Sequence, residues 1–296
     1  MITLSCDKLI TVEDVLAVAR GEVVELDLET KSMLDERREQ VTRFINQTGR
    51  PAYGFNRGFG SNVDEPVSPD NLVELQENLI RSHCAGMGEP VDAEVVRAVM
   101  FLRARSLVLG HSGVRSKLVE SLLNLLNADI VPVVPRMGSV GASGDLAPLS
   151  HVALALLGEG DVLAPGSRKR RPALDVMREA GLEPLKLEMK EGLALNNGVQ
   201  FSTALGILSL EKIEMLLETS CLATALSTHV RLGSDTPYME ELHQLRPHPG
   251  ALQVAKRLRH YMNDSPIRAS HQRYDVDGVV QDPYSLRCAG QILGAC

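Results

Sequence analysis

The fold is decided by one long proline-free stretch, Val199 to Leu232, which reads VQFSTALGILSLEKIEMLLETSCLATALSTHVRL. At ~1.5 Å rise per residue, a helix of this length would be about 50 Å long. Both flanking thirds are apolar nearly all round, and the charges cluster in the middle, at Glu211, Lys212, Glu214 and Glu218. A helix that is apolar on every side must be surrounded by other helices. We therefore expect a bundle of long helices with much of this segment buried, within the chain or between subunits.

The composition of the 296 residues favours a helical globular protein. Hydrophobic residues make up 44% and charged residues 23%, so burial can offset the entropy lost on folding. Aromatic residues are only 3% and tryptophan is absent, which predicts an aliphatic core of packed helices. The formal net charge of −7 argues against a nucleic-acid partner, because such binding needs a basic face.

The cysteines and the first residues indicate the compartment. The five cysteines are far apart, odd in number and without a CxxC pair, so neither a disulfide framework nor a zinc ribbon fits. The opening MITLSCDKLITVEDV carries early charges and lacks the apolar run of a signal peptide. No uncharged stretch reaches the ~18 residues that a membrane span needs. We expect a cytoplasmic protein without a membrane partner.

Residues 1–60 are predicted to form an α/β cap that ends in a tyrosine-bearing loop, and residues 61–296 a helical core. Val23 to Asp27 could form a short strand, and Lys31 to Gln47 a polar helix. A glycine-dense loop follows, Tyr53-Gly-Phe-Asn-Arg-Gly-Phe-Gly60. Further helices are expected where apolar residues recur at helical spacing, after residue 68, after Asp92, from about Val114 to Leu126 and from about Leu149 to Leu157. The predicted fold class is mainly α, a long antiparallel helix bundle with a small α/β N-terminal part.

A second glycine-dense loop, Gly138 to Asp145, reads GSVGASGD. It lacks the GK[ST] of a phosphate-binding loop, and the second glycine of a nucleophile elbow is replaced by Asp145. No dinucleotide fingerprint follows Gly58, and no HExxH pair offers zinc ligands. A serine hydrolase that uses Ser143 therefore remains only as an alternative, which predicts covalent labelling of that serine by an acyl or phosphonate probe.

The longer string GSVGASGDLAPLSH, from Gly138 to His151, resembles the signature of the histidine and aromatic amino-acid ammonia-lyases. In that family an Ala-Ser-Gly triplet cyclises into an electrophilic methylidene-imidazolone, and the matching residues here are Ala142, Ser143 and Gly144. The Gly144 nitrogen must attack the Ala142 carbonyl, so neither residue can carry bulk near the new ring. Ser143 must then lose its hydroxyl as water. The resemblance implies no external cofactor and no metal, because the electrophile forms from the chain itself.

Four further strings extend the resemblance in matching order from about residue 50 to the last residue. They are the loop that begins at Tyr53, RSHCAGMGEP from Arg81, EMKEGLALNNG from Glu188 and QDPYSLRC from Gln281. By resemblance, Tyr53 is the base that removes the β-proton of the substrate. Arg287 should grip the substrate carboxylate, because a planar guanidinium forms a bidentate pair with it. The remaining pocket-lining residues implied by the resemblance are Asn196, Gln281 and Tyr284.

His83 bears on the choice of substrate. An imidazole side chain pairs well with another imidazole, whereas a phenyl ring would need an apolar lining. The SHxxGxGEP pattern around His83 and the Cys288 that follows Arg287 also resemble the histidine-specific branch. The expected reaction is therefore elimination of ammonia from L-histidine to give trans-urocanate. Tyrosine remains the alternative substrate, because a histidine here could also meet a phenol oxygen.

The resemblance also implies an assembly, and the sequence departs from the family in places. Family members are homotetramers whose active sites combine loops from three subunits. Arg57 stands where the family usually has threonine, and Ser61 to Val67 replaces a more apolar stretch. The sequence stops at Cys296, whereas family enzymes continue through a C-terminal helical region that carries a catalytic glutamate and a pocket phenylalanine. We expect a truncated chain, and an inactive fragment or assembly partner remains an alternative.

Overall fold

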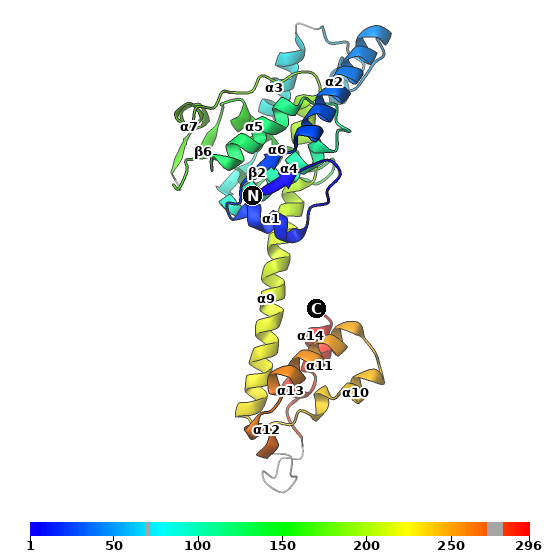
Figure 1. The fold of residues 1–296 in the computed structure, drawn as a ribbon, viewed down its shortest axis with the longest axis vertical. Helices are drawn as coiled ribbons and strands as arrows, with labels where there is room; N and C mark the ends of the chain where they lie inside the picture. Colours follow the sequence, from blue (N-terminus) through cyan, green and yellow to red (C-terminus); the bar gives the residue numbers. More distant parts are fainter. Residues whose placement is uncertain (69–70, 168, 271–280) are drawn as a thin grey trace. The chain divides into compact units, whose positions relative to one another are not determined.

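The computed structural model describes residues 1–68, 71–167, 169–270 and 281–296 (Figure 1). The chain folds as two compact units, Met1–Leu208 and Ser209–Cys296, each with its own hydrophobic cluster. The predicted mainly α fold is confirmed, because long helices dominate and every strand is short. The boundary expected after residue 60 stays a prediction. Within the described ranges, no helix combines the length and the apolar character needed to cross a bilayer.

The elements of the first unit follow in chain order. They are β1 (Ile2–Leu4), α1 (Val12–Ala19), β2 (Val24–Leu26), α2 (Leu28–Thr48), the short 3₁₀ helix η1 (Gly60–Asn62), α3 (Leu72–His83), β3 (Met87–Pro90), α4 (Ala93–Val108), α5 (Ser116–Asn127), β4 (Val131–Pro132), β5 (Pro135–Met137), α6 (Leu146–Leu156), β6 (Asp161–Leu163), β7 (Arg170–Pro172), α7 (Ala173–Glu179) and α8 (Glu191–Asn196). The helix α9 (Gln200–Val230) begins in this unit and continues into the second. The second unit then adds η3 (Thr236–Tyr238), α10 (Glu240–Gln244), α11 (Pro249–Met262), α12 (Pro266–Ser270), α13 (Tyr284–Arg287) and α14 (Ala289–Gly294).

The N-terminal α/β part forms close to where the sequence places it. The predicted strand is β2, which pairs in parallel with β1 so that Ile2 lies opposite Val24. The predicted polar helix lies within α2, which begins after Asp27 because that side chain accepts a hydrogen bond from the backbone N–H of Thr30. It ends at Gly49, whose left-handed backbone (φ 59°) is the usual glycine C-cap.

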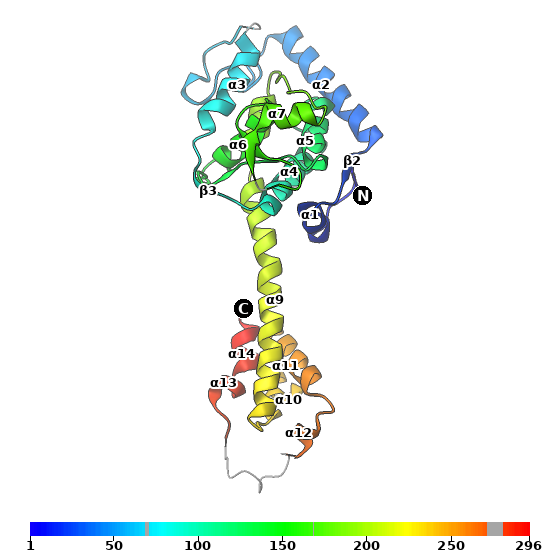
Figure 2. The same cartoon turned by 90° about the vertical axis from the view of Figure 1, so that its left-hand side faces the viewer.

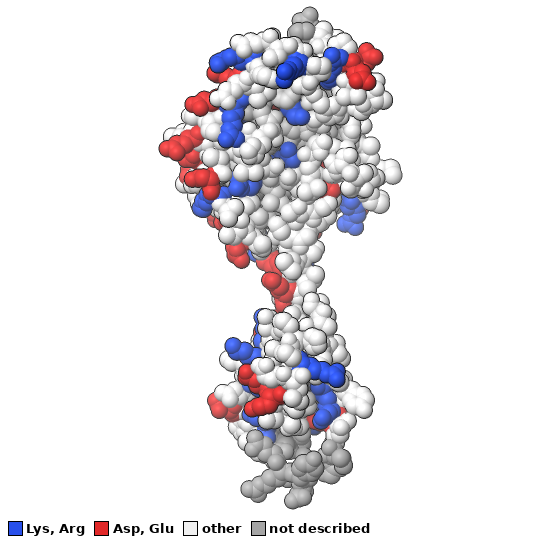
Figure 3. Space-filling view, turned by 90° about the vertical axis from the view of Figure 1, so that its right-hand side faces the viewer, with Lys and Arg blue, Asp and Glu red and all other residues white. Residues whose placement is uncertain are grey.

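Two helices form the centre of the first core. α4 packs against α5 and α1, and its Met100, Phe101 and Leu107 are fully buried. The buried Arg97 of α4 ties this layer together, because its Nε donates to the carbonyl of Val18 and its Nη1 to the carbonyl of Leu126. The core is aliphatic as expected, with few aromatic side chains among many leucines and valines. On the face drawn in Figure 3, acidic and basic side chains are interspersed over this unit.

A second group of helices positions the glycine-dense loops. α3, α6 and α8 contact one another pairwise, and Figure 2 shows α3 and α6 on one side of the first unit. β3 follows α3 closely and pairs antiparallel with β5, which leads through the Gly138 loop into α6. The Gly138 loop therefore begins beside β3 and ends at α6, which belongs to the group formed by α3, α6 and α8.

The predicted long helix is α9, with 31 residues, but its burial differs from the expectation. Several of its large apolar side chains are exposed, namely Leu210, Ile213, Met215, Leu216, Leu222 and Leu226. The described residues of the single chain do not cover these side chains. Burial between subunits stays a prediction.

The second unit packs around Tyr238. α11 contacts α14, and the buried cluster includes Cys221 and Ala225 of α9, Leu258 of α11 and Ala289 of α14. The Tyr238 side chain is completely buried, and its hydroxyl donates to the carbonyl of Leu286 at 2.5 Å. This contact anchors α13, the short helix that carries Tyr284 and Arg287.

We predict that Tyr238→Phe destabilises the second unit by about 1–3 kcal/mol, because the buried Leu286 carbonyl loses its donor. Urea unfolding followed by circular dichroism measures the loss, and hydrogen exchange over residues 284–294 locates it. Tyr284→Phe is the matched control, since that hydroxyl is on an exposed side chain and makes no hydrogen bond within the described residues. Equal stability of the two variants would contradict this account.

His151 joins α6 to the segment before β3. The backbone N–H of Gly86 donates to its Nε2 at 3.2 Å, which requires a ring nitrogen with a free lone pair. Burial lowers the pKa of His151 from its ordinary value of 6.5. The folded state therefore binds fewer protons at this histidine than the unfolded state does. The resulting stability is fully present above about pH 6.5 and is lost as the pH falls below that value.

We predict that the free energy of unfolding decreases as the pH falls below about 6.5, with one component due to His151. His151→Gln should reduce this decrease, because a glutamine carbonyl can accept from Gly86 without taking up a proton. The measurement is urea unfolding at intervals between about pH 5 and pH 7.5. The exposed His111→Gln serves as control and should retain the wild-type slope. An unchanged slope in His151→Gln would overturn the assignment.

Candidate active site

The Ala142-Ser143-Gly144 triplet lies on a loop that is closed at its base by side chains. Ala142 and Ser143 are exposed, whereas Gly144 is buried. The Ser139 hydroxyl donates to the Asp145 carboxylate at 2.7 Å, and the N–H of Gly141 donates back to the Ser139 oxygen at 3.3 Å. α6 begins immediately afterwards, at Leu146, so the positive end of its dipole faces the loop.

Asp145 holds this loop to the start of α9. Its carboxylate is almost completely buried and accepts the backbone N–H of Ser202 at 2.8 Å and the Ser202 hydroxyl at 2.7 Å. With the bond from Ser139, three donors compensate a charge that would be costly to bury alone. In the sequence, Asp145 stands out only because it replaces the second glycine of a nucleophile elbow. Its partner Ser202 lies 57 residues away, so no local motif marks this contact.

The triplet contacts the segment Asn196–Gly198, called the asparagine loop below, through its glycine. Gly144 has a φ of +108°, and a Cβ atom added to it would overlap the carbonyl oxygen of Gly198. The Asp145 N–H donates to that same oxygen at 2.6 Å. Asn196 ends α8 two residues earlier in the chain, and its Nδ2 lies 3.3 Å from the Ser150 hydroxyl of α6. The Asn196 Oδ1 is buried and has no hydrogen-bond partner among the described residues.

A buried cation lies behind the asparagine loop. Nη1 of Arg103, on α4, donates to the carbonyl of Asn197 at 3.1 Å and to Oε1 of Gln200 at 2.9 Å. Burial lowers the pKa of Arg103 to about 10, which still leaves it charged at neutral pH. It forms no salt bridge within the described part of the chain. Sequence reasoning missed this residue, because an arginine amid the apolar residues of a helix carries no local motif.

The loop of Tyr53 is stabilised by contacts of its own. The Tyr53 hydroxyl accepts the N–H of Gly60 at 3.3 Å, and its ring meets Phe59 edge-on at 5.7 Å between centroids. Nη1 of Arg57 donates to the carbonyl of Asp64 at 2.6 Å. The arginine that departs from the family pattern therefore closes the loop onto the segment that follows it.

Lys190 connects this loop with the start of α8. Its backbone N–H donates to the carbonyl of Gly54 at 2.7 Å, and its Nζ to the carbonyl of Tyr53 at 3.3 Å. Lys190 adopts a left-handed backbone (φ 75°), which is costly for a residue with a side chain. Burial also lowers the pKa of its ammonium group. Such strain is often found at functional sites, and the sequence gives no local signal for it.

His83 is the last residue of α3. Its Nδ1 lies 2.8 Å from the carbonyl oxygen of Leu79, so Nδ1 carries the proton and donates. In the neutral ring, Nε2 is then a hydrogen-bond acceptor. The pairing of Met87 with Met137 places the segment after His83 beside the strand that enters the triplet loop. The neighbouring Cys84 is not a nucleophile at neutral pH, since burial raises the pKa of its thiol to about 12.

The three remaining predicted site residues belong to the second unit. Gln281 and Tyr284 are exposed, and Arg287 is half-buried on α13. Their side chains make no hydrogen bonds or ion pairs within the described residues. The first unit contains Tyr53, His83, Asn196 and the triplet, and its helices α3, α6 and α8 contact one another, whereas Gln281, Tyr284 and Arg287 belong to the second unit.

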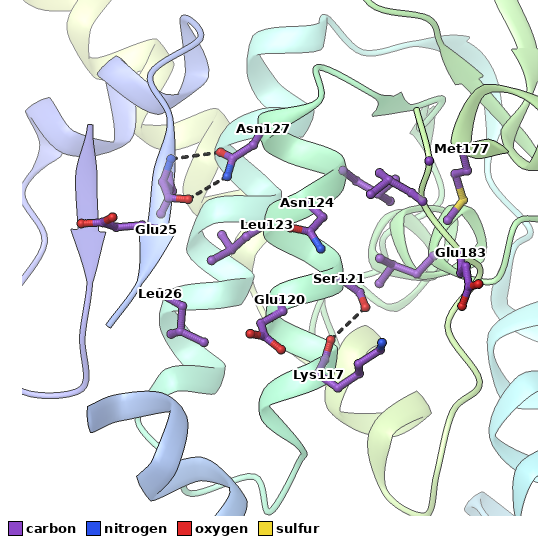
Figure 4. Close-up of a pocket in the computed structure, with 15 residues that line it drawn as sticks. Glu25, Leu26, Lys117, Glu120, Ser121, Leu123, Asn124, Asn127, Met177 and Glu183 are labelled. Carbon is purple, nitrogen blue, oxygen red and sulfur yellow. Dashed lines mark hydrogen bonds between the residues drawn. The ribbon is translucent and has the colours of Figure 1, made fainter. Parts of the chain in front are cut away.

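A pocket of about 620 Å³ lies elsewhere in the first unit, between β2, α5 and the residues after α7 (Figure 4). Figure 4 shows Glu25, Glu120 and Glu183 around it, with Asn127 held to the neighbouring strand by two hydrogen bonds. None of the predicted site residues lines this pocket. This surface pocket is therefore not part of the predicted active site.

Comparison with known proteins shows the family of the chain. The sequence profile of the family described as aromatic amino acid lyase matches residues 10–296. The histidine ammonia-lyase of Deinococcus radiodurans is 48% identical over 290 residues, which cover 98% of this chain and 54% of that protein. The chain thus spans about half the length of this curated relative.

Solved structures give the same result. The histidine ammonia-lyase of Trypanosoma cruzi superposes with a TM-score of 0.85 at 35% identity, covering 100% of this chain and 53% of that one. A tyrosine aminomutase from Streptomyces globisporus superposes with a TM-score of 0.88 at 35% identity, covering 99% and 58%. The clamped triplet loop and the match over nearly the whole length have one explanation: the chain belongs to the aromatic amino acid lyase family.

Proposed function

We propose that the protein eliminates ammonia from L-histidine and yields trans-urocanate, using a methylidene-imidazolone formed from Ala142, Ser143 and Gly144. The observation that carries this proposal is the seating of the triplet glycine against Gly198, with the His83 segment paired beside the same loop. The 48% identity to a histidine ammonia-lyase over nearly the whole chain supports the choice of reaction.

The residues of the loop fit the proposed ring. Gly144 has the positive φ and the close backbone neighbour that exclude any side chain, and Ala142 and Ser143 are exposed at the turn. Asp145 and Ser139 fix the ends of the loop and so favour a compressed turn. Once formed, the ring would supply an electrophile that turns the substrate amine into a better leaving group. The positive end of α6 would stabilise negative charge near the loop.

Two residues handle the proton and the carboxylate in this proposal. Tyr53 would remove the β-proton, and the N–H that Gly60 directs at its oxygen is a donor that stabilises negative charge there. Arg287 would bind the substrate carboxylate, because its guanidinium has no acidic partner within the described residues. Asn196 would contribute its Oδ1, which has no hydrogen-bond partner among the described residues, and Gln281 and Tyr284 would line the substrate pocket.

His83 decides the substrate in this proposal. Because its Nδ1 donates to Leu79, its Nε2 can accept a hydrogen bond from the imidazole N–H of histidine. A phenol hydroxyl could donate to the same nitrogen, so tyrosine remains the second candidate. The 35% identity to a tyrosine aminomutase keeps that candidate in the experiment below.

The proposal includes a homotetramer with shared active sites. The described residues leave several large apolar side chains of α9 exposed, and exposed apolar patches mark interfaces. Assembly could also join residues of the second unit of one copy to the triplet of another. We place the assembly in the cytoplasm, because all five cysteines are free thiols, which a reducing compartment preserves.

We predict that the purified protein releases ammonia from histidine, and that Ser143→Ala abolishes this release while leaving the fold intact. Incubation with histidine, tyrosine and phenylalanine in separate reactions measures the substrate preference. Mass spectrometry of the Ala142–Gly144 peptide should show the loss of two waters in the wild type only. Near-normal ammonia release from Ser143→Ala, or an unmodified wild-type peptide, would refute the proposal.

We predict that Tyr53→Phe loses nearly all turnover while keeping the two-water mass deficit of the triplet. The physical reason is that a phenyl ring keeps the contact with Phe59 but has no oxygen to take the proton; removing such a group typically costs about 10²- to 10⁴-fold in rate. Steady-state kinetics with histidine measures the loss. Arg57→Lys changes the same loop without removing the phenol and provides the comparison. A loss smaller than about tenfold in Tyr53→Phe would count against its role as base.

A further inference from the structure

One side chain, that of Gln76 on α3, connects the loop of Tyr53 with the beginning of α8. Its Nε2 donates to the carbonyl of Gly54 at 3.1 Å, and its Oε1 accepts the N–H of Gly192 at 2.9 Å. The side chain is completely buried. Because a carbonyl needs a donor and an N–H needs an acceptor, the orientation of the carboxamide follows from its two partners.

Both partners are backbone groups that need a bond from outside their own segment. The N–H of Gly192 belongs to the first turn of α8, where no carbonyl within the helix is available. Lys190, the residue before α8, has a left-handed backbone and gives no side-chain cap. Gln76 therefore caps α8 from another helix. A Cβ atom on Gly192 would lie 2.7 Å from the carbonyl oxygen of Gln76, so the two backbones are in close contact.

The three segments that meet at Gln76 carry three residues of the proposed site. Gly54 directly follows Tyr53, and α8 ends at Asn196. His83 is seven residues beyond Gln76 on α3, which is two helical turns along the same face. The carbonyl oxygen of Gly54 accepts one hydrogen bond from the Lys190 N–H and a second from Gln76 Nε2. Both of its lone pairs are then used, so the direction of the backbone beside Tyr53 is fixed.

We propose that Gln76 is a positioning residue, whose single carboxamide sets the place of Tyr53 relative to Asn196 and His83. It touches no reacting atom and acts through the backbone of Gly54 and Gly192. This inference rests on the proposed function, because it gives the two hydrogen bonds of Gln76 a role in the lyase reaction. The site needs one donor and one acceptor on the same rigid planar group, which a carboxamide supplies at every pH and an ionised carboxylate does not.

The test compares Gln76→Met and Gln76→Glu with a matched control, Asn127→Leu. Methionine has a similar length but removes both hydrogen bonds. A buried glutamate in its neutral form would still donate to the Gly54 carbonyl, so Gln76→Glu is compared at a pH at which its carboxylate is ionised; it then keeps the acceptor for Gly192 and loses the donor for Gly54. Asn127 is likewise an amide that binds one backbone N–H and one carbonyl, both of Val24, at 3.0 and 2.7 Å. It lies at the pocket of Figure 4, away from every predicted site residue.

Two measurements are independent of turnover. Hydrogen exchange at the amides of residues 54–60 should become faster in both Gln76 variants and remain unchanged in Asn127→Leu. Exchange at Gly192 should become faster in Gln76→Met only, because Gln76→Glu keeps its acceptor. The triplet should show the same two-water mass deficit in all variants. Unchanged exchange of residues 54–60 in Gln76→Glu would overturn the inference even if Gln76→Met failed to fold.

Turnover supplies the third measurement. The kcat for histidine should fall about tenfold or more in Gln76→Met with a smaller change in KM, since misplacing a reacting group by about 1 Å can cost on the order of 100-fold. Asn127→Leu should lose stability without this loss of kcat. Equal kcat in Gln76→Met and Asn127→Leu would show that Gln76 is only structural. If the wild type lacked both the mass deficit and ammonia release, the proposed function would fail. The exchange experiment would still test whether Gln76 holds the backbone of residues 54–60.

Discussion

The buried carboxylate of Asp145 is the interaction on which the arrangement of the first unit depends. A carboxylate away from water is tolerated only when its oxygens receive hydrogen bonds, and here they receive three, from Ser139 and Ser202. The N–H of Ser202 belongs to the first turn of α9, so Asp145 caps that helix and meets the positive end of its dipole. One side chain thereby fixes the triplet loop, the start of α6 and the start of α9.

Capping by a side chain from a distant part of the sequence also occurs at α8, where Gln76 accepts the N–H of Gly192. Both helices begin within the site, and both have their first-turn N–H groups bonded by side chains from distant parts of the sequence. A local cap would have placed a serine, threonine or aspartate directly before each helix, as Asp27 does for α2. Capping from a distance instead makes each helix start depend on its neighbours. The helices and the glycine loops therefore order together, and this suits a site built from several segments.

Caps supplied by distant residues are also the part of the site that the sequence could not predict. Apolar spacing placed α5 and α6, and the proline-free stretch placed α9, to within a few residues, because both signals are local. Gln76 and Asp145 lie 116 and 57 residues from the groups that they cap, so no window of neighbouring residues contains both partners. The exposed leucines of α9 show a further limit, because a segment that is apolar nearly all round indicates that the helix is covered but not which molecule covers it.

Arg103 shows why the site differs from an ordinary core. A buried guanidinium without an acidic partner weakens the fold, because burial favours the neutral form and lowers its pKa to about 10. The described residues offer only neutral oxygens, from Asn197 and Gln200, so stability alone does not account for this arginine. Its charge remains in a region of low dielectric directly behind the asparagine loop, where a positive potential acts strongly on nearby groups. Strongly perturbed charges are typical of functional sites, and this one lies where the triplet glycine meets Gly198.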